Sequence, residues 1–281
     1  MYTTIKGLKI HYLIEGTGIP CVIPSLAGTP IYERTFSANL RRHLKLVFVE
    51  LRANRSDVGD IGSTTLDSIV DDLDRLRDEL KFERIAVLGH SGHGFLPLRY
   101  ATRYPEHISH AILVGTVPAF DTARRFTEVA KYWEMLASKE RKDMVNRNYE
   151  RLSPVLSRAT ADEAMTLNYV VNGPVYFYDA HFDCTHLWKG HANNAELFQR
   201  FWGPGGEFSR FDPAAEFPNV RCPVLIASGV FDFGCVPTTW HGIKDKLANH
   251  EYQVFEKSGH YPHMEEQRRF DETLIEWLKR N

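Results

Sequence analysis

The 281-residue sequence predicts an α/β fold, in which helices cover both faces of a mostly parallel central sheet and a helical cap is inserted between two strands. Apolar runs typical of buried strands alternate with amphipathic helical segments, which is the pattern of such a sheet. The alternation stops between residues 119 and 220, where the pattern is mostly helical and too long for a loop. We therefore expect a core domain from residues 1–118 and 221–281, and a cap domain from residues 119–220.

The first part of the chain supplies most of the expected sheet. Strands are expected at residues 8–15, 21–26, 45–51, 84–88 and 110–115. Helices are expected at residues 65–80, which carry one apolar face, and at residues 95–104, which end before Pro105. After the cap, strands are expected at residues 222–229 and 251–256, and a final helix at residues 264–279.

Residues 89–94 read Gly-His-Ser-Gly-His-Gly, between the strand at 84–88 and the helix at 95–104. Small residues at this junction allow a sharp, strained turn on which the Ser91 hydroxyl projects above the sheet. The Gly92 N–H then points to where an oxyanion would form. The alternative is an ordinary strand-to-helix turn, since glycine and serine are common turn residues.

Two further residues complete a catalytic arrangement in the order Ser, acid, His. Asp232 follows the strand at 222–229, and His260 lies in a loop after the strand at 251–256. The carboxyl ends of parallel strands meet at one edge of a sheet, so these side chains are expected to approach Ser91. His260 would accept the serine proton, and Asp232 would fix the tautomer of the imidazole. Alone, either residue would be read as an ordinary loop residue.

With these residues in place, the chain resembles the α/β-hydrolase fold superfamily over essentially its whole length. The matching segments are residues 89–91, 100–106, 232–237 and 258–260, followed by 264–266. The likeness is greatest to the branch of proline iminopeptidases and related esterases, in which a similar aspartate-proline segment and a His-x-Pro-x-x-Glu-Glu ending occur. The resemblance implies a serine hydrolase that works through an acyl-enzyme.

Two segments depart from the family pattern. Ser25-Leu26-Ala27-Gly28 stands where relatives usually have His-Gly-x-Pro, which makes the Ala27 N–H the expected second donor of the oxyanion hole beside Gly92. A backbone N–H needs no particular side chain, so the hole can survive this change. Residues 50–57 lack the two glycines of the usual Asp-x-Arg-Gly-x-Gly segment, and we interpret this as a difference in the pocket lining.

The expected cap is rich in aromatic residues, which either line an apolar pocket or form the cap's own core. The candidate substrate-binding residues are His90, Tyr176, Tyr178, Trp188 and Trp202. We expect hydrolysis of an ester, lactone or related acyl bond of a small, partly apolar substrate. A proline iminopeptidase-like aminopeptidase, a carbon-carbon bond hydrolase and a ligand-binding receptor with a retained triad remain alternatives. An aminopeptidase would need carboxylates for the substrate ammonium, and the candidates are Glu128, Glu134, Glu150, Asp162 and Glu163.

Composition gives no support to several other classes of protein, such as nucleic-acid-binding and membrane proteins. The formal net charge of −2 gives no indication of a nucleic-acid or membrane-surface partner, and no apolar stretch approaches a membrane span. The first residues lack a signal-peptide core, so we expect a cytoplasmic enzyme that acts on a small molecule. The oligomeric state is left open.

No cofactor and no metal are expected. His181, His186 and His191 are spaced by five residues, which fits neither helical ligand spacing nor a zinc finger. The four cysteines are scattered, with Cys21 and Cys222 inside expected strands, so we interpret all four as structural thiols.

Overall fold

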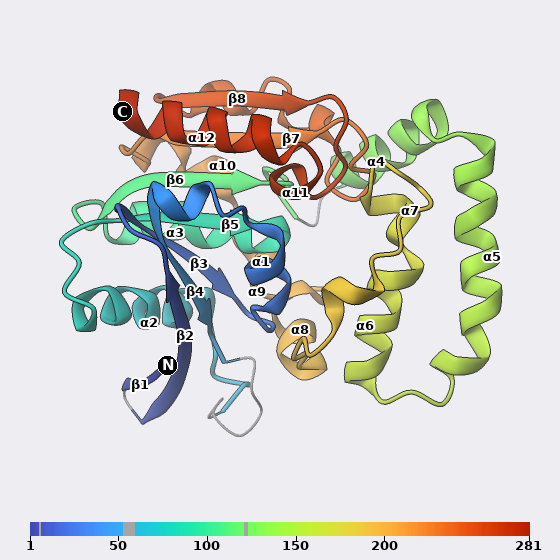
Figure 1. Cartoon of the computed structure of the whole chain (residues 1–281), viewed down its shortest axis with the longest axis horizontal. Helices are drawn as coiled ribbons and strands as arrows, with labels where there is room; N and C mark the ends of the chain where they lie inside the picture. The colour runs from blue at the N-terminus through green and yellow to red at the C-terminus, as the bar shows by residue number, and fades with distance from the viewer. Residues whose placement is uncertain (6, 53–59, 121–122) are drawn as a thin grey trace.

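The computed structural model describes residues 1–5, 7–52, 60–120 and 123–281, which contain an eight-stranded sheet in the order β1-β2-β4-β3-β5-β6-β7-β8 (Figure 1). The strands are β1 Tyr2–Ile5, β2 Leu8–Glu15, β3 Ile19–Ser25, β4 Leu44–Glu50, β5 Ile85–His90, β6 Ile108–Val114, β7 Val224–Gly229 and β8 His250–Phe255. The pairs β1–β2 and β2–β4 are antiparallel, and all pairs from β4–β3 to β7–β8 are parallel. The predicted α/β class is confirmed; β1, four residues long, is too short for its periodicity to predict.

Helices cover both faces of the sheet. They are α1 Pro30–Thr35, α2 Leu66–Glu79, α3 Phe95–Arg103, α11 Pro262–Glu265 and α12 Gln267–Arg280. Successive strand residues point to opposite faces, so Val87 packs in one core with α2 and α3, while Leu88 packs in the other with α1 and α12. The 65–80 and 95–104 predictions are confirmed, with Thr65 as the N-cap of α2.

The prediction of one unbroken final helix is wrong. Glu266 lies between α11 and α12 with φ −115° and ψ 50°, which is outside helical geometry. Its carboxylate accepts hydrogen bonds from the Lys257 N–H and the Ser258 hydroxyl, both at 2.8 Å. The break therefore coincides with a side chain that fixes the loop preceding His260.

Helices also fill the segment between β6 and β7. They are α4 Ala123–Leu136, α5 Lys139–Leu156, α6 Ala161–Val171, α7 Gly173–Tyr176, α8 Ala195–Trp202, α9 Glu207–Arg210 and α10 Pro213–Glu216. Figure 1 shows α4 to α7 beyond the carboxyl ends of β6, β7 and β8. None of the helices in the described ranges is both long and apolar enough to cross a membrane. The division of the chain into a core domain and a cap domain stays a prediction.

Short 3₁₀ helices complete the described secondary structure. They are η1 Leu40–Arg42, η3 Ser91–Gly94, η4 Thr185–Trp188, η5 Phe217–Asn219, η6 Pro237–Trp240 and η7 Lys244–Lys246. The η3 turn, which begins at Ser91, joins β5 directly to α3.

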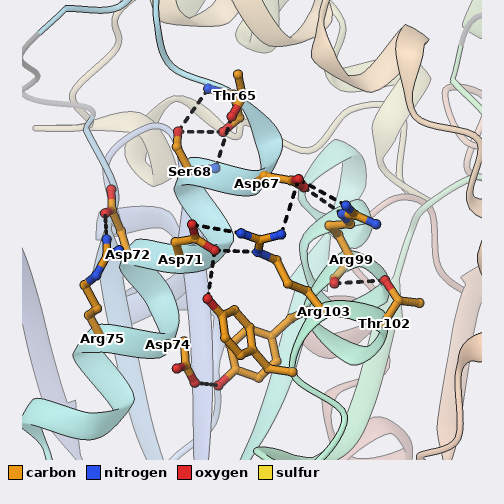
Figure 2. Close-up of polar contacts among 12 residues, drawn as sticks. Thr65, Asp67, Ser68, Asp71, Asp72, Asp74, Arg75, Arg99, Thr102 and Arg103 are labelled. Atoms are coloured by element: carbon orange, nitrogen blue, oxygen red, sulfur yellow. Dashed lines mark hydrogen bonds and ion pairs between the residues drawn. The ribbon is translucent and has the colours of Figure 1, made fainter.

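An ion-pair network fixes α3 against α2. Figure 2 shows Arg99 and Arg103 of α3 pointing toward Asp67 and Asp71 of α2, each arginine forming two hydrogen bonds to its aspartate. One turn further along, the Asp74 carboxylate accepts hydrogen bonds from the Tyr100 hydroxyl at 2.7 Å and from His107 and Arg77. Bidentate and shared contacts of this kind hold two helices in register.

Replacing Asp74 by alanine is expected to lower the free energy of unfolding by about 2 kcal/mol, because three hydrogen-bond donors lose their acceptor. Burial opposes ionisation of Asp74, but hydrogen bonds from Arg77, Tyr100 and His107 outweigh it and lower the pKa of this carboxyl. Its contribution should therefore be complete above the unfolded pKa of about 4 and disappear as pH falls through the lower folded pKa.

Chemical denaturation of both proteins at pH 7 and near pH 3 measures this difference. Asp78→Ala is the matched control on the same helix, since the Asp78 side chain is 83% exposed and lies 3.7 Å from Arg77. Equal losses in the two variants would contradict the assigned role of Asp74.

Candidate active site

The loops after β5, β7 and β8 bring Ser91, Asp232 and His260 to one edge of the sheet. Ser91 and His260 line the same cavity, which has a volume of about 310 Å³. Asp232 lies behind His260, and its exposed fraction is 0%. The three strand ends thus assemble groups that are distant along the chain.

Ser91 occupies a strained turn. Its φ of 58° lies in the left-handed region, which non-glycine residues rarely adopt, so the predicted strained elbow is confirmed. Gly89 is required at the start of the turn, because a Cβ there would lie 2.3 Å from the His93 carbonyl oxygen. A Cβ at Gly92 would lie 2.3 Å from Trp202 Nε1, so the ring of Trp202 approaches this backbone closely.

Asp232 and His260 form a buried pair. The His260 Nδ1 atom lies 2.6 Å from Asp232 Oδ2, and Asp232 Oδ1 accepts the N–H groups of Gly234 at 3.0 Å and Cys235 at 2.7 Å. The backbone N–H of His260 donates to the Tyr176 carbonyl oxygen at 2.6 Å. An ionised Asp232 keeps the proton of neutral His260 on Nδ1, which leaves the Nε2 lone pair available for a proton from a nucleophile.

Cys235 is a neighbour of this pair that the sequence interpretation treated only as a structural thiol. It lines the cavity, and its thiol and the Ser91 side chain share a hydrogen bond. Burial and the nearby Asp232 raise the pKa of the thiol, so it is neutral at pH 7. Among the described residues, Asp232, Cys235 and His260 place possible metal-ligand atoms within 4.8 Å of one another. The Asp232 and His260 side chains already share a hydrogen bond, and the Cys235 thiol is protonated.

Cys21, Cys184 and Cys222 lie outside the cavity, as do His181 and His186, whereas His191 lines it. Cys21 is buried in β3, whereas Cys222 is buried two residues before β7 begins and not within the strand as predicted. His181 contacts Glu140 at 3.1 Å, and the His186 ring contacts the Asp183 carbonyl oxygen.

Residues 25–28 comprise the last residue of β3 and the loop that follows it, and they are called the oxyanion loop below. Ser25, Leu26 and Ala27 line the cavity together with Gly92. The Ala27 N–H donates to Ser25 Oγ at 3.1 Å, and the Leu26 N–H donates to His93 Nε2 at 2.9 Å. The assignment of Ala27 and Gly92 as oxyanion donors stays a prediction. For Ala27, it requires the substrate oxygen to replace the Ser25 hydroxyl.

Four of the five predicted substrate-binding residues line the cavity, namely His90, Tyr176, Trp188 and Trp202. Tyr178 is the exception. This residue is 42% exposed, its ring packs edge-on against Phe231, and it borders a separate hollow on the surface. The helix α7 ends at Tyr176, and Tyr178 lies outside the cavity.

The structure adds several lining residues that sequence reasoning did not select. These are Ile31, Tyr32, His93, Val117, Phe120, Arg125, Met165, Tyr169, His191, Asn194, Phe198, Gly234, Cys235 and Tyr261. The elbow has His93 where the family motif has a glycine, and this departure could have indicated a role for His93. No local pattern distinguished the other lining residues. The altered segment at residues 50–57 lies outside the described residues from 53 onward, so its interpretation as pocket lining is untested.

Glu265 connects the His260 loop to the segment after α7. Its carboxylate accepts the N–H groups of Tyr178 at 2.6 Å, Gly259 at 2.8 Å and Tyr261 at 3.4 Å. Burial raises the pKa of this carboxyl to about 7, although the three N–H donors favour ionisation. Glu265 therefore binds the backbone on both sides of His260, at Gly259 and Tyr261, and its carboxyl titrates near neutral pH.

Replacing Glu265 by glutamine is expected to lower kcat/KM for an activated ester about tenfold, because the amide NH₂ meets backbone donors and the His260 loop shifts. Glutamine mimics the protonated carboxyl, so the wild-type advantage should grow as pH rises through about 7. A pH series of kcat/KM measures the ratio, with the exposed Glu272→Gln as control. A ratio that is flat with pH would contradict this role.

Comparison with known proteins agrees with the fold. A family model described as alpha/beta hydrolase fold matches residues 35–267. The AB hydrolase superfamily protein YclE of Bacillus subtilis (strain 168) is 29% identical over 276 residues, which cover 97% of this chain and 96% of that protein. A proline iminopeptidase of Clostridium botulinum is 28% identical over 227 residues, covering 75% and 72% of the two chains.

Solved structures show the same architecture. An esterase from Exiguobacterium antarcticum is 20% identical and superposes with a TM-score of 0.72, covering 99% of this chain and 98% of that chain. A proline iminopeptidase from Mycobacterium smegmatis is 15% identical with a TM-score of 0.72, covering 100% and 97%. At these identities the likeness shows the fold alone. Since the family model spans most of the sequence and the sheet order agrees, the chain belongs to the alpha/beta hydrolase fold family.

Proposed function

We propose that this chain is a serine hydrolase that cleaves an ester, lactone or related acyl bond through Ser91, His260 and Asp232. The observation that carries the proposal is the buried Asp232–His260 hydrogen bond of 2.6 Å beside a cavity that also contains the strained Ser91. A serine hydroxyl is a weak nucleophile at neutral pH, and a tautomer-fixed imidazole is the group that activates it.

The reaction begins when the Ser91 hydroxyl rotates from Cys235 toward His260 Nε2. His260 accepts the proton while Ser91 Oγ attacks the acyl carbon, and backbone N–H groups of Gly92 and the oxyanion loop stabilise the oxyanion. His260 then protonates the leaving alcohol, which leaves an acyl group on Ser91. Water activated by His260 releases the acid and restores the hydroxyl.

The cavity supports a small, partly apolar substrate. Its volume of about 310 Å³ lies at the lower end of the range for small-molecule sites. Aromatic rings of Tyr169, Tyr176, Trp188 and Trp202 contribute to the wall that the helices between β6 and β7 provide. An acyl or ring moiety of the substrate can pack against these rings.

An aminopeptidase is the second candidate, because a proline iminopeptidase is among the relatives. Its substrate carries an ammonium group, yet the cavity-lining residues that the structure describes include Arg125 and no carboxylate. Glu128 instead contacts Thr238, Glu134 pairs with Lys142, and Glu163 accepts from Thr160 at the start of α6. Among the residues described, this favours an ester or lactone over an aminoacyl substrate.

A substrate panel tests the proposal. The wild-type protein is expected to turn over short-chain p-nitrophenyl esters and small lactones at least tenfold faster than proline or alanine p-nitroanilides. A fluorophosphonate is expected to label Ser91, as peptide mass spectrometry would detect. Faster aminoacyl cleavage would favour the aminopeptidase, and cleavage of a vinylogous diketone alone would favour carbon-carbon bond hydrolysis. Ligand-induced stabilisation without turnover would favour a receptor, and labelling that spares Ser91 would remove the triad assignment.

A further inference from the structure

Three buried side chains connect the oxyanion loop to the backbone of His260. The Leu26 N–H donates to His93 Nε2 at 2.9 Å, and His90 Nε2 lies 2.9 Å from the His260 carbonyl oxygen. Between the two rings, the Tyr32 hydroxyl lies 3.4 Å from His93 Nδ1 and 3.3 Å from His90 Nδ1. The two end contacts are short and the two central contacts are long.

The two backbone ends determine every proton position in this chain of contacts. The Leu26 N–H can only donate, so His93 Nε2 is an acceptor and the neutral ring carries its proton on Nδ1. The His260 carbonyl can only accept, so His90 carries its proton on Nε2 and its Nδ1 accepts. The Tyr32 hydroxyl therefore donates to His90 Nδ1 and accepts from His93 Nδ1, which shares its proton with the His90 backbone. Each of the four contacts then pairs one donor with one acceptor, and no two donors or two acceptors face each other.

Burial keeps this arrangement in its neutral form. Tyr32, His90 and His93 are at most 7% exposed. Burial lowers the pKa of His93 to about 4 and holds the pKa of His90 well below its ordinary value, with the neighbouring His260 adding to the effect on His90. A protonated His93 would lose its acceptor for the Leu26 N–H, and a buried unpaired donor is costly.

Tyr32, His90 and His93 also surround the nucleophile. His90 and His93 flank Ser91 in the elbow, and the His90 ring lies 4.5 Å from the His260 ring between centroids. Tyr32 belongs to α1, which follows the oxyanion loop directly. On the far side of the loop, the Gly28 N–H donates to the Ala192 carbonyl oxygen at 2.8 Å. The loop is therefore held at Leu26 by the His93 side chain and at Gly28 by the Ala192 backbone.

We propose that Tyr32, His90 and His93 are positioning residues that hold the oxyanion loop and the backbone of His260 in a fixed relation around Ser91. The inference rests on the proposed function, since it assigns the loop a role in stabilising the oxyanion. The inference also explains why position 93 is a histidine, where the family motif usually has a glycine. A glycine there has no side chain to accept the Leu26 N–H.

The consequence is expected in kcat rather than in KM. The hydrogen bonds of Tyr32, His90 and His93 set the distance between the oxyanion donors and the reacting carbon, although the His93 ring also packs edge-on against Trp202 of the apolar wall. A misplacement of about 1 Å in such a site costs up to about 100-fold in rate. Loss of the link should therefore slow acylation and leave ground-state binding of the substrate nearly unchanged.

Three single variants and one double variant test the proposal with a p-nitrophenyl ester. His93→Leu removes the acceptor and Tyr32→Phe removes the central hydroxyl, and each is expected to lower kcat about 10- to 100-fold with KM within about twofold. His93→Gln retains an acceptor for Leu26 and a donor for Tyr32, so it should recover most of the lost kcat. The Tyr32→Phe, His93→Leu double variant should be little slower than either single variant, because both break one link.

Matched controls separate positioning from general stability. His110→Leu removes a buried histidine that packs against Trp277, and Tyr100→Phe removes a buried tyrosine hydroxyl that donates to Asp74. Both controls should keep the wild-type kcat even where they lower the melting temperature. An unchanged kcat in His93→Leu, or equal losses of kcat in His93→Leu and His110→Leu, would overturn the inference.

A measurement independent of turnover keeps the inference separate from the proposed function. With ¹⁵N-labelled histidine, NMR at pH 7 is expected to show His93 protonated on Nδ1 and His90 on Nε2 in the wild-type protein. The opposite tautomer in either ring would overturn the inference even if the esterase activity is present. Failure of every ester substrate, with these tautomers observed, would instead remove the proposed function and leave the link between loop and backbone supported.

Discussion

Replacing Ser91 by alanine is expected to lower kcat for an activated ester by about 10⁵-fold or more, with the chain still folded. The reason is geometric: Ser91 is held at a φ of 58° and lines the cavity that His260 also lines. Without its hydroxyl no acyl-enzyme forms, and only binding and the oxyanion donors remain to assist water. KM should change little, since the cavity wall is intact.

Steady-state kinetics and fluorophosphonate labelling measure this effect. Ser157→Ala serves as control, because Ser157 is exposed and its hydroxyl donates to the Pro154 carbonyl oxygen. Adding His260→Ala to Ser91→Ala should cost little more than either change alone, since the nucleophile and its base act as one unit. Losses that add in the double variant, or a Ser91→Ala protein with more than about one hundredth of wild-type kcat, would end the assignment.

The parts of the site that the sequence predicted are those set by local rules. Strand ends in a parallel sheet meet at one edge, so the positions of Ser91, Asp232 and His260 after apolar runs were sufficient to expect them together. The order of these residues along the chain added to that expectation. The glycine-rich elbow predicted the strained turn for the same local reason.

The parts that could not be predicted depend on contacts between distant segments. His93 meets Leu26 across 67 positions of sequence, and the direction of that hydrogen bond depends on where the loop after β3 lies. Tyr176 and Tyr178 are two residues apart, yet only Tyr176 lines the cavity, because α7 ends there and Glu265 holds the Tyr178 N–H on the other side. Cys235 was interpreted as structural because the four cysteines are scattered along the chain, and no local pattern showed that it lies beside Ser91.

Replacing Asp232 by asparagine is expected to lower kcat about 10⁴-fold while the fold is retained. The asparagine oxygen can keep the hydrogen bonds from the Gly234 and Cys235 N–H groups, which Asp232 Oδ1 now accepts at 3.0 and 2.7 Å. Its NH₂ group must then face His260 Nδ1. A donor at that place forces Nδ1 to accept and moves the imidazole proton to Nε2, where it blocks uptake of the Ser91 proton.

Because the asparagine variant changes the tautomer but not the turn, it separates catalysis from folding more sharply than Asp232→Ala does. The alanine variant loses the turn acceptor for two backbone N–H groups as well, and should also unfold at a lower denaturant concentration. Kinetics together with denaturation of both variants makes the comparison, and ¹⁵N NMR of His260 reports the tautomer directly. An asparagine variant within tenfold of wild-type kcat would mean that Asp232 does not orient the base, and the acid of the triad would have to be sought elsewhere.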